Sequence, residues 1–265
     1  MTGGDARSIQ VGGAVSVAGG DVQGAQLAGA GNWAGGDVRG LQLGGAVNVA
    51  HDLRGAQIGG AVNVGRDLQG MQLAVVNIGA DVTGLQLGVI NIARRVHGLQ
   101  LGVVNVADDV DGASVGLVSA VRDGHRAAEV WGSDIVPLLV GVKLGSRHVY
   151  SLFAAGATPE VAHLGVGLGV HAPLGPAYLD VDATSYELLR FDGSTNPTDM
   201  LAQARVMVGI PILPRVSVFG GAAVNAAFAF DGVGESLSHL GSRVYRGDNV
   251  VLRLSPGLFA GVSLH

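Results

Sequence analysis

One short phrase recurs along the first half of the chain, and it constrains the fold more than any other feature. A clear copy reads Gly98-Leu-Gln-Leu-Gly-Val-Val-Asn-Val. Copies start at residues 8, 24, 40, 55, 70, 84, 98 and 112, so the period falls from 16 to 14 residues along the chain. A near-constant period of this length is typical of a solenoid, in which each copy forms one structural unit that stacks on the next.

Each copy predicts two short strands joined by a corner. Leu99 and Leu101 alternate with Gln100, which is the period of a β-strand, and after Gly102 the alternation changes phase. Every copy has the same order of parts, so equivalent strands run in the same direction, whereas successive hairpin strands would alternate in direction. We therefore expect a β-solenoid over residues 8–124, with coils of 14–16 residues and parallel strands about 4.8 Å apart.

Stacking in register places like residues above one another. The first predicted column contains Gln26, Gln42, Gln57, Gln72, Gln86 and Gln100. The second predicted column contains Asn32, Asn48, Asn63, Asn77, Asn91 and Asn105. Amide side chains stacked in this way hydrogen-bond along the column, as they do in cross-β structures, so we expect both columns to be structural.

A column of aspartates also runs through the repeats, interrupted by Arg95. Calcium-binding solenoids place Asp and Gly in a nine-residue rhythm, which this chain lacks. We therefore expect the aspartates to accept hydrogen bonds from backbone N–H groups at turns rather than to hold a metal.

The repeat copies resemble a family of bacterial surface-repeat proteins whose units read Gly-Leu-Gln-(Leu/Ile)-Gly-Leu-Val-Asn. The similarity covers Gly40 to about Val106 well and the flanking copies loosely. The resemblance implies a location at the cell envelope or cell surface, and it implies no particular reaction.

Long alternating segments of a different kind fill residues 125–265. In one of them, aliphatic residues from Leu164 to Val170 alternate with glycines between His163 and His171. Seven or eight such strands of 9–14 residues are predicted, with loops at residues 192–197 and 232–249. Strands of soluble sheets average about 5–6 residues, whereas about 9–11 are needed to cross a bilayer. We expect an antiparallel up-and-down β-barrel or sheet, similar to the barrels of outer membranes.

The composition indicates which face of these strands points outward. Charged residues make up 14% of the chain, and Lys143 is the only lysine, whereas soluble β-proteins use lysine to protect their exposed edges. We expect the aliphatic faces to meet lipid and the polar faces to line a tight interior, where Lys143, Arg205 and Arg253 pair with Asp180 and Asp182. Aromatic residues are only 5% of the chain, although membrane barrels carry aromatic girdles, so a soluble sandwich is the alternative.

Candidate catalytic and metal-binding residues are few. Asp180 and Asp182 lie about 7 Å apart along one strand, an arrangement that could serve glycoside hydrolysis, although pairing with internal cations explains them more simply. His163 and His171 lie about 26 Å apart along a strand, too far to share a metal. The chain has no cysteine, no phosphate-binding loop and no nucleophile elbow. We expect no catalytic residue, no cofactor and no metal site, and hence a protein that is not an enzyme.

The charge pattern and the first residues of the chain bear on partners and location. The net charge of −5, without a basic stripe, argues against nucleic-acid binding. The first twenty residues lack the basic start and apolar core of a signal peptide, so no export signal is visible in this chain. We expect a structural protein of the bacterial outer membrane or cell surface that contacts lipid. A narrow pore through its barrel is one function that this location would allow. The alternative is a soluble solenoid scaffold that self-associates through its open coil ends.

Overall fold

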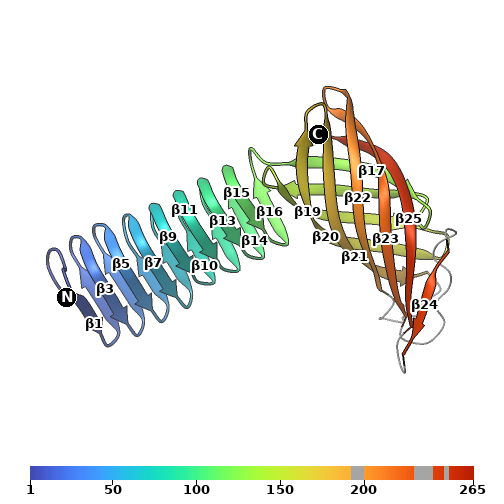
Figure 1. Ribbon diagram of the computed structural model, residues 1–265. Helices are drawn as coiled ribbons and strands as arrows, with labels where there is room; N and C mark the ends of the chain where they lie inside the picture. Colours follow the sequence, from blue (N-terminus) through green and yellow to red (C-terminus); the bar gives the residue numbers. More distant parts are fainter. Residues whose placement is uncertain (192–199, 230–240, 248–250) are drawn as a thin grey trace. The chain divides into compact units, whose positions relative to one another are not determined.

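The computed structural model describes residues 1–191, 200–229, 241–247 and 251–265, and the regular structure of these residues is β-strand alone (Figure 1). No helix in these ranges is long and apolar enough to cross a membrane. The chain divides into two compact units, which are treated separately below. One contains Met1–Gly124 with Gly145–Arg147, and the other contains His125–Leu144 with His148–His265. The predicted all-β fold class is confirmed.

The first unit is a β-solenoid built from two parallel sheets of eight strands each. One sheet contains β1 (Ile9–Gly12), β3 (Val22–Ala28), β5 (Val38–Gly44), β7 (Leu53–Gly59), β9 (Asp67–Leu73), β11 (Asp81–Leu87), β13 (Arg95–Leu101) and β15 (Asp109–Val115). The other contains β2 (Val15–Ala18), β4 (Gly31–Ala34), β6 (Val47–Val49), β8 (Val62–Val64), β10 (Val76–Ile78), β12 (Ile90–Ile92), β14 (Val104–Ala107) and β16 (Val118–Val121). The strands follow one another from blue to green in Figure 1, and the predicted parallel solenoid is confirmed.

The repeat places equivalent residues of successive coils in register. Gln86 pairs with Gln72 on one side and Gln100 on the other, and Asn91 pairs with Asn77 in the same manner. The two amide columns are fully buried between the sheets. A column of aliphatic residues shares this interior, formed by Ala6, Val22, Val38, Leu53, Leu68, Val82, Val96 and Val110.

The buried amides form two hydrogen-bonded ladders that run in opposite directions. In the glutamine ladder, each Nε2 donates to the Oε1 of the glutamine one coil earlier, at 2.7–3.0 Å. In the asparagine ladder, each Nδ2 donates to the Oδ1 of the asparagine one coil later, at 2.7–3.1 Å. From Asn48 to Asn105, Nδ2 also donates to a backbone carbonyl in the next coil, at 2.8–3.0 Å. The side chains therefore satisfy buried polar groups along the stack.

A glycine column explains why each copy begins with the same residue. Its members have φ between 134° and 143°: Gly24, Gly40, Gly55, Gly70, Gly84, Gly98 and Gly112. A Cβ at Gly84 would overlap the carbonyl oxygen of Gly70 in the preceding coil. The conformation and the close approach of the two backbones both require glycine.

The aspartate column lies along an exposed edge of the solenoid. Backbone N–H groups of Asp21 and Asp37 donate to the carboxylates of the aspartates one coil earlier, at 3.1 and 2.9 Å. The predicted role as an acceptor of backbone N–H groups is confirmed for Asp21 and for Asp52, to which the Asp67 N–H donates at 3.3 Å. Where Arg95 interrupts the column, it pairs with Asp81, and its hydrogen bond holds the pKa of Asp81 below the ordinary value. Such exposed pairs contribute little to stability.

The second unit is a closed antiparallel barrel of eight strands. They are β17 (Arg126–Ser133), β18 (Leu139–Gly145), β19 (Val149–Ala157), β20 (Val161–Leu174), β21 (Ala177–Arg190), β22 (Met200–Leu213), β23 (Val216–Ala229) and β25 (Val251–Leu264). The barrel closes because β17 pairs with both β18 and β25. A short additional strand, β24 (Arg243–Arg246), pairs with the first residues of β25. The sequence left open whether these strands form a barrel or a sheet, and the pairing of β17 with β25 decides for the barrel.

The predicted loop at residues 232–249 is wrong at Arg243–Arg246, because these residues find a partner on the free edge of β25. Residues 232–240 and 248–249, and the predicted loop at residues 192–197, lie outside the described residues.

Replacement of one amide within the asparagine ladder should destabilise the solenoid. Asn77 accepts from Asn63 and donates to Asn91, so Asn77→Ala removes one hydrogen bond from the Nδ2 of Asn63 and takes from the buried Oδ1 of Asn91 its donor in the ladder. We expect a loss of about 3 kcal/mol in the free energy of unfolding, measured by thermal unfolding of the full chain. Thr83→Ala, at an exposed position on the next strand along the chain, β11, is the matched control. Equal effects of the two changes would contradict the structural role of the ladder.

Extension of the same ladder should stabilise the solenoid. The column begins with Ser16 in place of asparagine, and the Oδ1 of Asn32 is buried without a hydrogen-bond partner. Ser16→Asn should supply the missing donor and raise the free energy of unfolding by about 1 kcal/mol. Ser16→Ala serves as the comparison, and a melting temperature no higher for Ser16→Asn than for Ser16→Ala would argue against this account.

Candidate functional site

Aliphatic side chains cover the outside of the barrel. The exposed members include Val130, Val140, Val142, Leu164, Val166, Leu168, Val170, Val181, Val206, Val208, Ile210, Val218, Val224, Leu258 and Val262. We call these residues the aliphatic belt. They lie opposite one another across neighbouring strands, so that Val130 pairs with Val140 on one side and Val262 on the other. The belt is therefore continuous across the seam where the barrel closes.

Charged side chains are nearly absent from the face that carries the belt. Along β17–β23 and β25, within the described residues, the charged positions on this face are Arg126 and Glu187, each towards the end of its strand. The aromatic rings of the barrel are mostly used inside, where Trp131, Tyr150, Tyr178, Tyr186, Phe219 and Phe259 are buried. The outer surface is consequently aliphatic rather than ringed by aromatic residues.

The interior holds a buried arginine–carboxylate pair. Arg205 donates from Nε and Nη2 to the two carboxylate oxygens of Asp182, at 2.7 and 2.9 Å, and the Tyr150 hydroxyl donates to Asp182 Oδ2 at 3.0 Å. The guanidinium also lies over the rings of Trp131 and Phe259, with its carbon 4.8 and 5.2 Å from the ring centres. This bidentate, ring-stacked geometry suits arginine and would not suit lysine. The predicted pairing of Asp182 with Arg205 is confirmed.

A second buried cluster is centred on the single lysine. The Nζ of Lys143 lies 2.7 Å from Glu129 Oε1 and 2.8 Å from Asp180 Oδ2. The other oxygen of Asp180 lies 2.6 Å from Nδ1 of His171. Asp180 thus takes Lys143, one of the three predicted internal cations, as its partner, while Arg253 lies partly buried on β25.

Sequence reasoning missed Glu129 as a member of this cluster. Glu129 shares a strand face with the buried Ala127 and Trp131, and period two places these three residues together. The segment is short, and its pattern alone gives no reason to prefer one face. The partner that makes the burial tolerable, Lys143, comes from the neighbouring strand.

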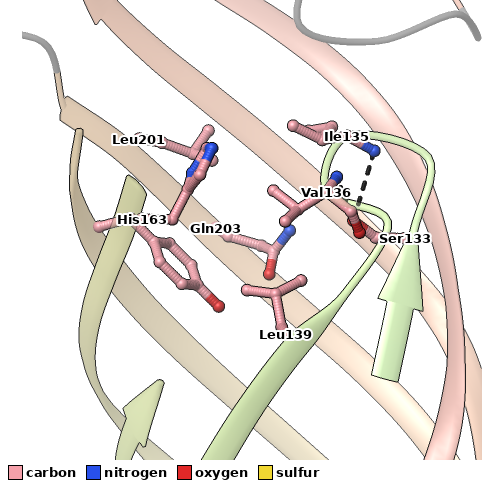
Figure 2. A pocket seen from close by; sticks show the side chains of 8 residues that line it. Ser133, Ile135, Val136, Leu139, His163, Leu201 and Gln203 are labelled. Atoms are coloured by element: carbon pink, nitrogen blue, oxygen red, sulfur yellow. Dashed lines mark hydrogen bonds between the residues drawn. The ribbon is translucent and has the colours of Figure 1, made fainter. Parts of the chain in front are cut away.

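The barrel interior contains a small cavity beside His163 and Gln203. A cavity of about 10 Å³ is lined by Ser133, Ile135, Val136, Leu139, His163, Tyr186, Leu201 and Gln203 (Figure 2). Figure 2 also shows the hydrogen bond by which the Ile135 N–H donates to Ser133 Oγ, at 3.3 Å, in the turn beside this cavity. This volume holds about one water molecule and is far too small for a sugar. Asp180 and Asp182 do not line this cavity; both are buried and form ion pairs with Lys143 and Arg205.

Comparisons with known proteins find no match for this chain among protein-family models, curated proteins or solved structures. The resemblance of the repeats to bacterial surface-repeat proteins stays a prediction from the residues themselves.

Removal of the buried arginine should destabilise the barrel strongly. Arg205→Met leaves the carboxylate of Asp182 buried without its cation, and breaking such a pair costs about 3–5 kcal/mol. The double variant Arg205→Met with Asp182→Asn removes the isolated charge and should recover a large part of the lost stability. Unfolding followed by Trp131 fluorescence measures both changes. A double variant no more stable than Arg205→Met alone would mean that the uncompensated carboxylate is not the cause.

Proposed function

We propose that this protein is a non-enzymatic structural component of a bacterial outer membrane or cell surface, and that the aliphatic belt of its barrel faces lipid acyl chains. The observation that carries the proposal is the orientation of the barrel side chains. Val181 and Val206 point outward on β21 and β22, while the neighbouring Asp182 and Arg205 pair inside. A barrel built for water would have the opposite arrangement.

The extent of the belt supports this location. Soluble monomers rarely expose contiguous apolar patches larger than a few hundred square ångströms, because such surface favours association. The belt runs around the barrel through residues paired strand to strand, as Val170, Val181 and Val206 are. Contact with acyl chains would remove this surface from water.

The strands on one side of the barrel are long enough to span a bilayer. Strands β20–β23 and β25 contain 14 residues each. At about 3.3 Å per residue and a tilt of about 40°, such a strand rises about 35 Å, against a hydrocarbon core of about 30 Å. Strands β17–β19 have 8, 7 and 9 residues, so the barrel wall is lower on their side.

The packed interior favours a structural role over conduction. Trp131, Tyr150, Lys143 and Arg205 are fully buried within the barrel. An eight-stranded barrel is just wide enough for side chains to fill its interior, and here they do so with large rings and paired charges. A narrow pore would require these groups to move aside.

The second candidate function is a soluble scaffold that self-associates through the solenoid. Strands β1 and β2 are the first strands of their sheets, and sheet edges invite pairing with other chains. Ile9 and Val11 on β1 expose 67% and 77% of their surface. Light scattering of the full chain in buffer would show concentration-dependent association if this function holds.

A matched pair of substitutions on one strand tests the membrane proposal. Val181 lies in the middle of the belt and Glu187 lies near the strand end, and both face outward from β21. If the belt faces lipid, Val181→Arg should reduce the stability of the barrel folded into phosphatidylcholine vesicles by about 2–4 kcal/mol, whereas Glu187→Arg should have an effect below about 1 kcal/mol. The measurement is a urea titration of the folded, vesicle-bound chain.

Two results together would contradict the membrane proposal. They are a full chain that is monomeric in buffer without detergent, and equal stability of Val181→Arg and Glu187→Arg. Arginine at an exposed position of a water-soluble barrel has little effect on stability.

A further inference from the structure

Histidines gather at one end of the barrel, at the turns that join β20 to β21 and β22 to β23. His125 directly precedes β17, His171 lies near the end of β20, and His265 follows β25. The rings of His125 and His171 stack with their centres 4.4 Å apart, and the ring of His265 lies 6.1 Å from that of His125. The barrel register thus brings together three histidines that are far apart in the sequence.

Two of these histidines share a compact set of donor atoms with a buried carboxylate. One donor atom each from His125, His171 and Asp180 lies within 4.8 Å of the other two. Asp180 Oδ1 is already 2.6 Å from His171 Nδ1, and Lys143 occupies the other oxygen, Oδ2. One oxygen of Asp180 is therefore directed towards the histidines.

The Nε2 atom of His125 has no hydrogen-bond partner in the described part of the chain, although it is buried. A buried polar nitrogen without a partner is unfavourable, and such groups call for an explanation. The imidazole ring of His125 packs against the rings of His171 and of Tyr150, whose centre is 5.5 Å away. These ring contacts give Nε2 no hydrogen bond. A ligand that accepts the nitrogen lone pair would supply the missing interaction.

We propose that His125, His171 and Asp180 bind one divalent transition-metal ion of the class of Zn²⁺, Cu²⁺ or Ni²⁺. Imidazole nitrogens combined with a carboxylate suit these ions, whereas Ca²⁺ and Mg²⁺ prefer oxygen ligands alone. Bond lengths of about 2.0–2.2 Å place tetrahedral ligand atoms about 3.3 Å from one another, so small side-chain rotations close the site. On binding, the ion replaces the proton between His171 and Asp180.

The surrounding charges are compatible with a bound cation. The buried carboxylates Glu129, Asp180 and Asp182 outnumber the buried cations Lys143 and Arg205 by one. A metal ion therefore enters a cluster with an excess of negative charge. Water can complete the coordination, since His265 already uses Nε2 to contact Ser217 Oγ at 2.9 Å.

The bound ion would connect the residue that precedes β17 with the β20–β21 hairpin. It would thereby restrain the start of the strand that closes the barrel, and its binding energy would add to the stability of the folded state. The expectation from sequence that no metal site exists rested on the distance between His163 and His171, on the absence of cysteine and on the period of the aspartate column. The structure keeps those two apart in the fold and pairs His171 with His125 instead. The site does not depend on whether the barrel lies in a membrane.

A second cluster, on the solenoid, provides an internal control. His51 contacts Asp37 and Asp52 at 3.3 and 3.5 Å; His51 is exposed, and the two aspartates are partly exposed. These three side chains satisfy one another by ion pairing at the surface. The substitution His51→Gln therefore shows whether a metal bound by the chain is held at this solenoid cluster.

The test is titration of the full chain with Zn²⁺ by calorimetry and with Co²⁺ by visible absorption, after treatment with a chelator. We expect one ion per chain, bound with a rise in melting temperature. His125→Gln and His171→Gln should each weaken binding by about 100-fold or more, while His51→Gln leaves it unchanged. Far-UV circular dichroism without metal shows whether each variant keeps its strand content.

Two results would overturn the proposal. One is a wild-type chain that takes up no ion and shows no metal-dependent rise in melting temperature. The other is binding that survives His125→Gln and His171→Gln but disappears with His51→Gln. If His125→Gln does not fold, the milder His125→Asn and the metal-dependent melting temperature of His171→Gln decide between the two outcomes.

Discussion

Buried polar side chains need partners inside the chain, and this requirement organises both units of the protein. In the solenoid, the glutamines and asparagines are as buried as the valines beside them, and in-register stacking gives their amides donors and acceptors one coil away. In the barrel, Asp182 and Asp180 are tolerated because Arg205 and Lys143 reach them from other strands. A slip of one residue in either unit would leave amides or charges unpaired, so the polar interior fixes the register.

A polar interior has a consequence for the outer surface. Aliphatic residues that are not needed inside occupy the outward face, as Leu168 and Val206 do on the barrel. The same tendency occurs in the solenoid, where Leu43, Val47 and Val89 are exposed. The shortage of lysine leaves little charge with which to cover this surface. The proposed contact of the barrel with lipid follows from this inverted distribution, since lipid is the solvent in which such a surface is favourable.

Sequence periodicity predicted the elements well because each element obeys a local rule. The repeat predicted the coils, the parallel direction and the two amide columns, since stacking places identical residues over one another. Alternation predicted the outward face of Leu164 to Val170 and the inner position of Asp180 and Asp182. The same reasoning did not place Glu129 or His125 in an interior cluster. Glu129 depends on Lys143 of the neighbouring strand β18, and His125 depends on His171 of β20, so both places are set by contacts between strands. It also left the short strand β24 undetected, because that strand exists only as a partner of β25.

The sequence by itself determined that the first half stacks as a parallel solenoid and that the second half has one aliphatic and one polar face. These properties depend on the spacing of residues along one strand, which the sequence contains directly. Only the tertiary structure decided that β17 meets β25 and closes the barrel, and which charges meet inside it. Those outcomes depend on the stagger between strands and on the width of the closed barrel, and both are properties of the assembled sheet.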